Sequence, residues 1–365
     1  MIILRFLAAT AAIVGTQLVL ATAFVGIGLL FRRGFGVRRI EWDDLFSSFW
    51  IGFSLVLLLL QLWSFRFPVG IAALVLVLGL GTLGLLGARR HDWAVDRRSA
   101  LPCLLILLPI SVWMAGIAME SVQNWDAGLY HVQAIKWIES YPAVPGLVNL
   151  FGPLAFNNSS FLYDALLDSG PWEDRAYHVA NGLLVLALAA QAVSGAVHLL
   201  RRGNRGRPRH VFDLLLLGPA VAMVRVETIA SYVTDVSTVL VLLAALSAWY
   251  ALLTDPGKEG RERAYAAVVV GALLAAAVCL KLSTALFVAI AWPLAVVSWL
   301  ATARPNRRLA VRTLAWATAL GIALVGSWMG RGIVTSGYPL FPHRLAAAPV
   351  EWRAPAEHAD AERAY

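Results

Sequence analysis

The segment at residues 124–137, NWDAGLYHVQAIKW, collects polar side chains in a chain that is otherwise strongly apolar. Asp126 is followed by Tyr130 and His131 at helical spacing. A positioned carboxylate of this kind can serve as a general base that takes a proton from an acceptor hydroxyl. An Asp before a helix also commonly caps the first turn. We therefore expect Asp126 to be a cap, a general base, or both.

Lys281 stands inside the apolar stretch AAAVCLKLSTALF, with almost no loop around it. An ionisable residue between two apolar segments is a functional-site hypothesis, because burying charge there is costly. Snorkelling to the lipid head groups is the alternative for Lys281. Asp235 could pair with Lys281 or bind substrate. Arg331 and Arg225 could each hold an anionic oxygen, and an anchoring role is the alternative for Arg331.

Two asparagines, Asn157 and Asn158, lie in the same long segment as Asp126. They could contact sugar hydroxyls, or form a turn and a helix cap. His131 and Tyr130 could orient Asp126 or contact sugar hydroxyls themselves. A hydrogen-bonded packing group is the simpler interpretation of His131.

The sequence gives weak support for a metal cofactor. A divalent metal is conceivable, because Asp126, Glu227 and Asp235 are all expected on one side of the membrane, but their spacing is not that of a known ligand set. The two cysteines, Cys103 and Cys279, fall within apolar segments and do not form a recognisable metal or disulfide framework.

The composition predicts what kind of secondary structure positions these residues. The chain has 365 residues, of which 59% are hydrophobic and 14% charged, and its mean hydropathy is +0.71. Soluble domains have about 25% charged residues, and a membrane-spanning helix needs roughly 20 apolar residues. We therefore predict an all-α polytopic membrane protein with about ten transmembrane helices and further interfacial helices. The sixth contains Asp213 and Pro219 and is expected to be tilted, broken or re-entrant. The predicted spans are near 6–31, 46–64, 69–88, 101–119, 178–200, 211–224, 234–253, 264–280, 284–301 and 313–329.

Alternate loops are basic and hold two thirds of the 30 Lys and Arg residues. Such loops stay in the cytoplasm, and contacts with anionic lipids explain their arginines better than nucleic-acid binding does. Both termini and the long segment 120–177 are then extracytoplasmic. The basic loops are 32–39, 88–98, 201–209, 258–263 and 304–312, and the opposite side receives 120–177, 225–235, 281–283 and 330–344.

The residues that follow Asp126 predict an amphipathic helix at the membrane interface. Pro142 and Pro145 should end it. A second short helix, FLYDALLDS, is expected to begin at a cap formed by Ser159 or Ser160. The apolar face of the first helix should consist of Tyr130, Ala134, Trp137 and Tyr141.

Together these segments resemble the GT-C superfamily, multi-pass glycosyltransferases that use lipid-phosphate-linked sugars on the outer face of the membrane. SVQNWDAGLYHVQAIKW is similar to the family's acidic site in the first large outward loop, which implies a general base at Asp126. CLKLSTALFVAIAWP is similar to the segment whose lysine lies near the donor phosphate, which implies that role for Lys281. More narrowly, residues 100–345 resemble a bacterial family of uncharacterised GT-C-like proteins, on WDAGLYHVQAIKWIESYPAVPGLVNL, LAFNNSSF and RGIVTSGYPLFP.

The chain departs from the GT-C pattern in three places. The outward loop follows the fourth predicted span, whereas one span precedes it in most relatives, and NLFGP at 149–153 replaces an NLHGR-like stretch, losing a His and an Arg. Relatives continue with further spans, whereas this sequence ends in an acidic helix expected from Pro355, so it could be a fragment or a truncated homologue. We divide the chain into N-terminal transmembrane helices at 1–99, a GT-C-like core at 100–345 and a C-terminal segment at 346–365.

The resemblance implies inverting transfer of a sugar from a polyprenyl-phosphate donor to a glycan, lipid or protein acceptor outside a bacterial inner membrane. Asp126 would be the base, and Lys281 with Arg331 and Arg225 would hold the departing phosphate. A transporter or flippase of lipid-linked glycans is the alternative from another class, and it should show charges at mid-membrane depth and broken spans. A polysaccharide polymerase and a purely structural membrane subunit are the remaining alternatives.

Overall fold

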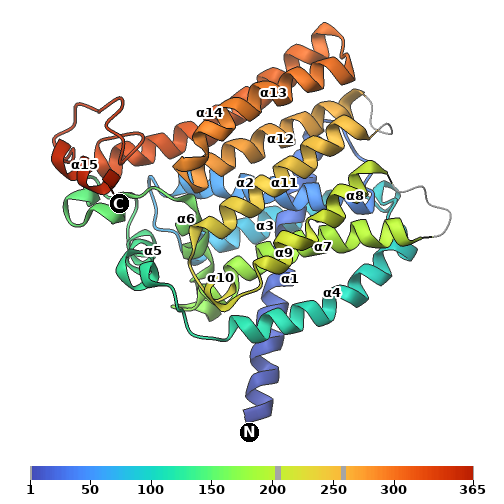
Figure 1. The fold of residues 1–365 in the computed structure, drawn as a ribbon, viewed down its shortest axis with the longest axis horizontal. Coiled ribbons are helices and arrows are strands. Elements are labelled where there is room, and N and C mark those ends of the chain that lie inside the picture. Colours follow the sequence, from blue (N-terminus) through green and yellow to red (C-terminus); the bar gives the residue numbers. More distant parts are fainter. Residues whose placement is uncertain (1, 202–206, 256–259, 365) are drawn as a thin grey trace.

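The computed structural model describes residues 2–201, 207–255 and 260–364, and within them every regular element is a helix (Figure 1). Eight helices are long and apolar enough to cross a membrane. They contain few charged residues, and as helices they satisfy their backbone hydrogen bonds internally, as a membrane-spanning segment must. They are α1 (Ile2–Gly34), α2 (Trp42–Trp63), α4 (Arg97–Ala118), α7 (Ala180–Leu200), α11 (Thr234–Thr254), α12 (Gly260–Leu280), α13 (Ala285–Ala303) and α14 (Arg307–Ser336).

Eight is fewer than the ten predicted spans, and the two exceptions have distinct causes. Helix α3 (Ile71–Gly87) is a shorter apolar helix of 17 residues, which at 1.5 Å per residue gives about 26 Å, at the lower limit for a membrane span. The expected disturbance of the sixth span is confirmed, because it divides at Leu216 into α8 (Pro208–Leu215) and α9 (Leu217–Ala222). Pro219 has no N–H to continue the helical ladder, which accounts for the break.

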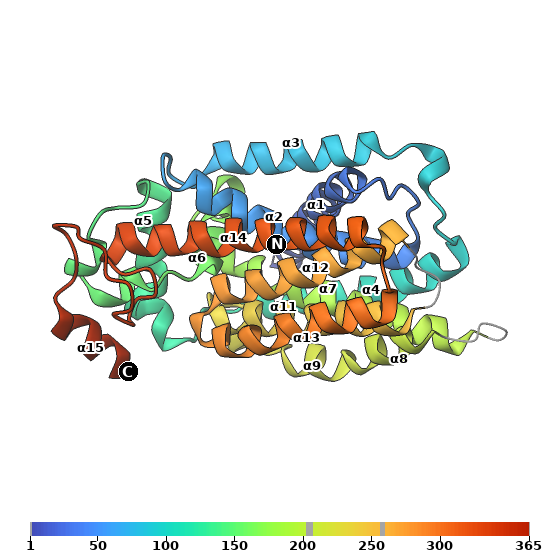
Figure 2. The ribbon, with the colours of Figure 1, turned by 90° about the horizontal axis from the view of Figure 1, so that it is seen from above.

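Small residues let the first three helices approach closely. A Cβ added to Gly84 of α3 would lie 1.8 Å from the carbonyl oxygen of Gly26 in α1, so the two backbones touch, as is common between membrane helices. Figure 2 shows α3 along the outer side of α1 and α2. Helix α12 lies inside the bundle, between α11, α13 and α14, and nearly all of its residues from Val268 onward are buried.

The basic loops meet at one end of the molecule, as their sequence predicts, and we call it the basic end. The Ile40 N–H donates to the Asp92 carbonyl (2.8 Å), which joins the loop after α1 to the loop after α3. Arg201, after α7, forms an ion pair with Asp96 (3.0 Å). Further contacts at this end are the ion pair of Arg207 with Asp255 (3.2 Å) and one cavity lined by Arg33, Gly36, Arg261 and Arg312.

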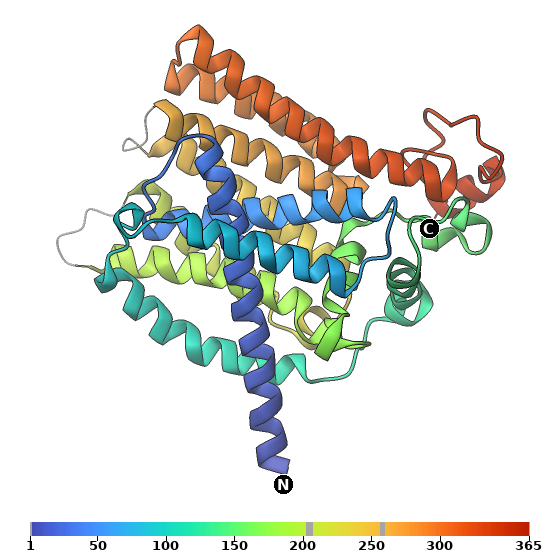
Figure 3. The same ribbon diagram turned by 180° about the vertical axis from the view of Figure 1, so that it is seen from behind.

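The opposite end carries the long segment 120–177, and we call it the loop end. Helices α5 (Val132–Ser140), α6 (Ser159–Leu167) and α15 (Ala356–Ala364) gather there with the C-terminus, whereas the first turns of α1 project from the bundle (Figures 1 and 3). The last residues fold back over this segment, since Asn149 Nδ2 donates to the Trp352 carbonyl (2.8 Å). The C-terminal helix expected from Pro355 is confirmed and begins one residue later.

Candidate functional site

Asp126 is the second residue of a helix that runs from Trp125 to Ser140 and contains a π-helical turn over Ala127–His131. The cap of this helix is Asn124, whose Oδ1 accepts hydrogen bonds from the N–H groups of Asp126 (2.8 Å) and Ala127 (3.3 Å). In the described part of the chain the Asp126 side chain makes no capping bond. The expectation that Asp126 is the cap is therefore wrong. Its carboxylate is exposed, a position from which it can reach a ligand.

The residues of this helix that pack against the protein differ in part from its predicted aromatic face. Tyr141 is 52% exposed, and Tyr130 and Trp137 are only half-buried. The rings of Trp137 and Tyr141 lie 5.2 Å apart, centroid to centroid, and their location at head-group depth stays a prediction. The buried residues are Ala127, His131, Ala134, Ile135 and Ile138.

His131 is enclosed by aromatic rings at the start of this helix. Its ring centroid lies 4.4 Å from that of Tyr130 and 5.1 Å from that of Phe161, and the residue is only 3% exposed. Burial lowers the pKa of His131 to about 4, so the imidazole is neutral at physiological pH. Burial, helped by the Asp126 charge, raises the pKa of Tyr130 to about 12. His131 and Tyr130 can thus serve as neutral hydrogen-bonding groups.

Lys281 and Asp235 form an ion pair at the same place. Lys281 stands between α12 and the short turn Leu282–Thr284, and Asp235 lies in the first turn of α11. Burial dominates the pKa of His131, and the charges of Asp126, Asp235 and Lys281 act on it as well. The charges of three residues from three separate segments therefore act on one buried imidazole.

Arg331 is a buried residue that fixes the long segment. It is 6% exposed, and its Nη1 donates to Asn157 Oδ1 (2.7 Å). The Asn157 carbonyl accepts a further hydrogen bond from Trp328 Nε1 (2.5 Å). Of the two roles expected for Arg331, anchor or phosphate clamp, this geometry fits the anchor, and it gives Asn157 a structural role as well.

The remaining predicted residues lie at helix starts. Arg225 is exposed and precedes the short helix α10 (Val226–Ile229). Asn158 is half-buried and occupies the N-cap position of α6, although within the described residues its side chain makes no capping bond. The expected cap by Ser159 or Ser160 is wrong. Ser159 Oγ instead accepts a hydrogen bond from Gln61 Nε2 (2.8 Å), because the side chain faces α2.

Sequence reasoning missed an ionic cluster beside this site. Lys136 Nζ lies within ion-pair distance of Glu139 (2.8 Å), Asp168 (2.9 Å) and Asp174 (2.5 Å). Burial, followed by the hydrogen bond with Asp168, raises the pKa of Glu139 to about 8. The i, i+3 spacing of Lys136 and Glu139 was a visible signal, but the other two acids approach only through the fold.

A cavity of about 360 Å³ opens between this cluster and the residues next to Asp126. Trp125, on its rim, is 91% exposed, which is unusual for so large an apolar ring. Aromatic rings and polar groups together suit a ligand that has both apolar faces and hydroxyls. The lining includes Asn124, Trp125, Lys136, Asp174, Tyr177 and Tyr232.

The acids proposed for a divalent metal do not form a metal-ligating group in the described residues. In this part of the chain, one group of three side chains lies close enough together to hold an ion. The group consists of Asp43, His198 and His210 and lies at the basic end.

The fold and the site define an all-helical, multi-pass membrane protein with a cluster of ionisable residues at one end of the bundle. The chain belongs to a family described as a domain of unknown function, DUF8201, whose model matches residues 11–365. No curated protein and no solved structure matches the chain.

Proposed function

We propose that this protein is a glycosyltransferase that moves a sugar from a polyprenyl-phosphate carrier to an acceptor hydroxyl at the loop end. The observation that supports this most is the ion pair of Lys281 with Asp235, whose charges act on His131 together with that of Asp126. The exposed carboxylate of Asp126 and the half-exposed ammonium group of Lys281 are the two charges that such a transfer needs. A base activates the acceptor, and a cation stabilises the departing phosphate.

In the proposed reaction, the Asp126 carboxylate takes the proton of the acceptor hydroxyl as its oxygen attacks the anomeric carbon. The bond from this carbon to the phosphate oxygen breaks, and its electron pair stays on the polyprenyl phosphate. The displacement inverts the anomeric centre. Lys281 meets the negative charge where it develops, and neutral His131 orients the reacting groups without competing for the proton.

The buried side of the site has a supporting role in this proposal. Arg331 and Asn157 hold the long segment in place, so Lys281 and the exposed Arg225 are the cations that remain for the phosphate. The ring of Trp125, with Tyr177 and Tyr232 deeper in the cavity, offers surfaces for the apolar face of a sugar.

The proposal includes a location in the bacterial inner membrane, with the loop end extracytoplasmic. The excess of arginine at the basic end supports this orientation. A topology reporter fused after residue 150 should be active outside the membrane, and one fused after residue 90 should be active in the cytoplasm. Activity of both reporters on the same side would contradict the orientation.

Transfer is tested with the purified protein, a pool of radiolabelled lipid-linked sugars and a membrane extract as acceptor. We expect label to move from the lipid to a product that survives mild acid, with the opposite anomeric configuration. Retained configuration, or no movement of label from any donor in the pool, would contradict the proposed reaction.

A transporter or flippase of lipid-linked glycans is the second candidate, and the broken sixth span favours it. Asp213 of α8 is 3% exposed and accepts hydrogen bonds from Gln191 and Ser247 (both 2.6 Å) in the long helices α7 and α11. Buried acids beside interrupted helices are typical of transport pathways. Vesicles that contain the protein would distinguish the two functions, since a flippase moves the labelled lipid across the membrane without transferring its sugar.

A further inference from the structure

A second cluster of ionisable side chains lies at the basic end, at the opposite end of the helices from the proposed transfer site. Asp43 stands in the first turn of α2, His198 in the last turn of α7 and His210 in α8. Each side chain offers one ligand atom, and the three atoms lie within 4.8 Å of one another. We propose that these three residues bind a zinc ion, which joins α2, α7 and α8 independently of the proposed transfer reaction.

The donor set and its geometry suit Zn²⁺. Two imidazoles and one carboxylate form a ligand set that zinc prefers, with the fourth position open to water. His210 Nε2 lies 3.2 Å from Asp43 Oδ2. Two ligands about 2.1 Å from a tetrahedral zinc ion are about 3.4 Å apart, so a small adjustment would admit the ion. The His198 ring is 4.4 Å from the His210 ring, centroid to centroid.

The hydrogen bonds around the two histidines prepare them for a ligand. His198 Nδ1 hydrogen-bonds to the Ser194 carbonyl (2.8 Å), so the proton lies on Nδ1 and the Nε2 lone pair is available. A backbone carbonyl that accepts the other ring N–H commonly orients a zinc-binding imidazole in this way. His210 is 4% exposed, and Nε2 is the nitrogen that faces Asp43 and would bind the ion.

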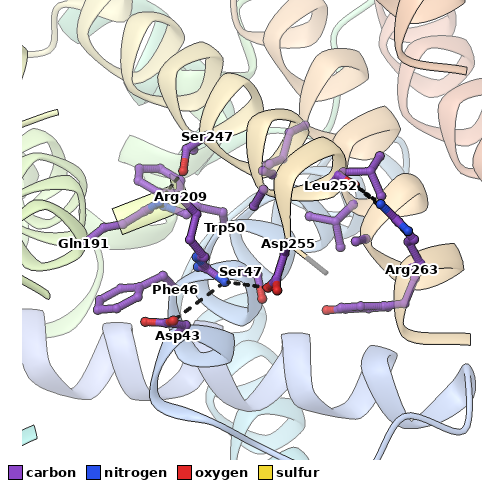
Figure 4. A pocket seen from close by; sticks show the side chains of 17 residues that line it. Asp43, Phe46, Ser47, Trp50, Gln191, Arg209, Ser247, Leu252, Asp255 and Arg263 are labelled. Atoms are coloured by element: carbon purple, nitrogen blue, oxygen red, sulfur yellow. Dashed lines mark hydrogen bonds and ion pairs between the residues drawn. The ribbon is translucent and has the colours of Figure 1, made fainter. Parts of the chain in front are cut away.

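Arg209 is the cation that an incoming metal would meet. Its Nη1 lies 3.7 Å from Asp43 Oδ2, and Figure 4 shows it between Asp43 and Asp255 beside a cavity. The guanidinium also contacts Asp213 (3.7 Å) and Asp255 (4.0 Å). Because it is shared among three carboxylates, it offsets only part of the Asp43 charge. A hydrogen bond from His210 to Asp43 would explain that pair without a metal, but it gives no role to His198.

Zinc binding by the full-length protein tests the proposal. After purification in detergent and removal of metal with a chelator, we expect one equivalent of Zn²⁺ to bind with a dissociation constant of about 1 μM or tighter, and to raise the melting temperature. His198→Ala and His210→Ala should each weaken binding by at least about 100-fold, as expected when one of three protein ligands is lost. His91→Ala is the matched control, because His91 lies at the same end with 68% of its side chain exposed. It should bind zinc as the wild type does.

Asp43→Asn provides a second variant in case the histidine variants do not fold. It keeps the size of the side chain and replaces the anionic ligand, so zinc affinity should fall while the melting temperature of the zinc-free protein changes much less. Absence of a stoichiometric zinc ion on the wild-type protein would overturn the proposal. Wild-type zinc affinity in Asp43→Asn and in the folded histidine variants would also overturn it, because the ion would then bind elsewhere. Neither result depends on glycosyl transfer.

Discussion

Replacing Lys281 with alanine should weaken donor binding far more than it weakens the fold. The side chains of Lys281 and Asp235 are 38% and 61% exposed, and an ion pair this exposed contributes only about 0.2–1 kcal/mol to stability. A charge-assisted bond to a phosphate oxygen contributes roughly 1.5–3 kcal/mol, equivalent to a loss of about 10- to 150-fold in affinity. The predicted change in binding therefore exceeds the predicted change in stability.

The assay is equilibrium binding of radiolabelled polyprenyl phosphate to the purified protein, with the melting temperature measured on the same samples. Lys281→Arg keeps the charge and should recover part of the affinity, although the geometry of its donors differs. Asp235→Asn removes the carboxylate that competes for Lys281, so binding should tighten. Unchanged phosphate binding by Lys281→Ala would refute the reasoning and leave Lys281 as a residue that only snorkels to the head groups.

Three further predictions follow from the hydrogen bonds of the loop end. Asn124→Ala should lower the free energy of unfolding by about 0.5–2 kcal/mol, because it removes the cap. Asp126→Ala should leave this free energy unchanged. Equal losses for the two variants in thermal unfolding would contradict the assignment of the cap to Asn124. Because the pKa of Glu139 is raised, the folded state binds the proton more tightly than the unfolded state, and stability should fall as the pH rises from about 4.5 through about 8. Glu139→Gln should flatten this part of the plot of melting temperature against pH. An unchanged plot would contradict the raised pKa. Arg331→Ala leaves Asn157 Oδ1 without its donor and should lower stability by roughly 1–3 kcal/mol. A loss of activity in this variant with no loss of stability would mean that Arg331 binds the substrate instead.

Much of the fold follows from properties that depend on sequence alone. The Arg and Lys content of alternate loops predicted that these loops lie at one end of the molecule, and Pro219 predicted the break in the sixth span. Helix α3 is shorter than the span predicted near 69–88, because its helical part runs only from Ile71 to Gly87. Hydropathy measures how apolar a segment is, and it does not fix where the helix begins and ends.

The site was less predictable, because its residues depend on local geometry and on distant contacts. The segment after Asp126 was correctly expected to be helical, but the π-helical turn at Ala127–His131 has no signal in the spacing of the residues. Asn124, two residues before Asp126, took the capping bond. Asp168 forms an ion pair with Lys136 although 32 residues separate them in the chain. The sequence around these two residues does not predict the contact.

The central claim is that Asp126 takes the acceptor proton, and the rate of sugar transfer by Asp126→Asn tests it most directly. Asparagine has nearly the same size but cannot accept a proton at neutral pH, and since Asn124 caps the helix, the fold should be unaffected. On purified protein with a transferable lipid-linked sugar, we predict a rate lower by roughly 10²- to 10⁴-fold, the usual contribution of a general base. Donor binding and melting temperature should stay at their wild-type values. Transfer by Asp126→Asn at the wild-type rate would contradict the account, because the reaction would then proceed without the proposed base.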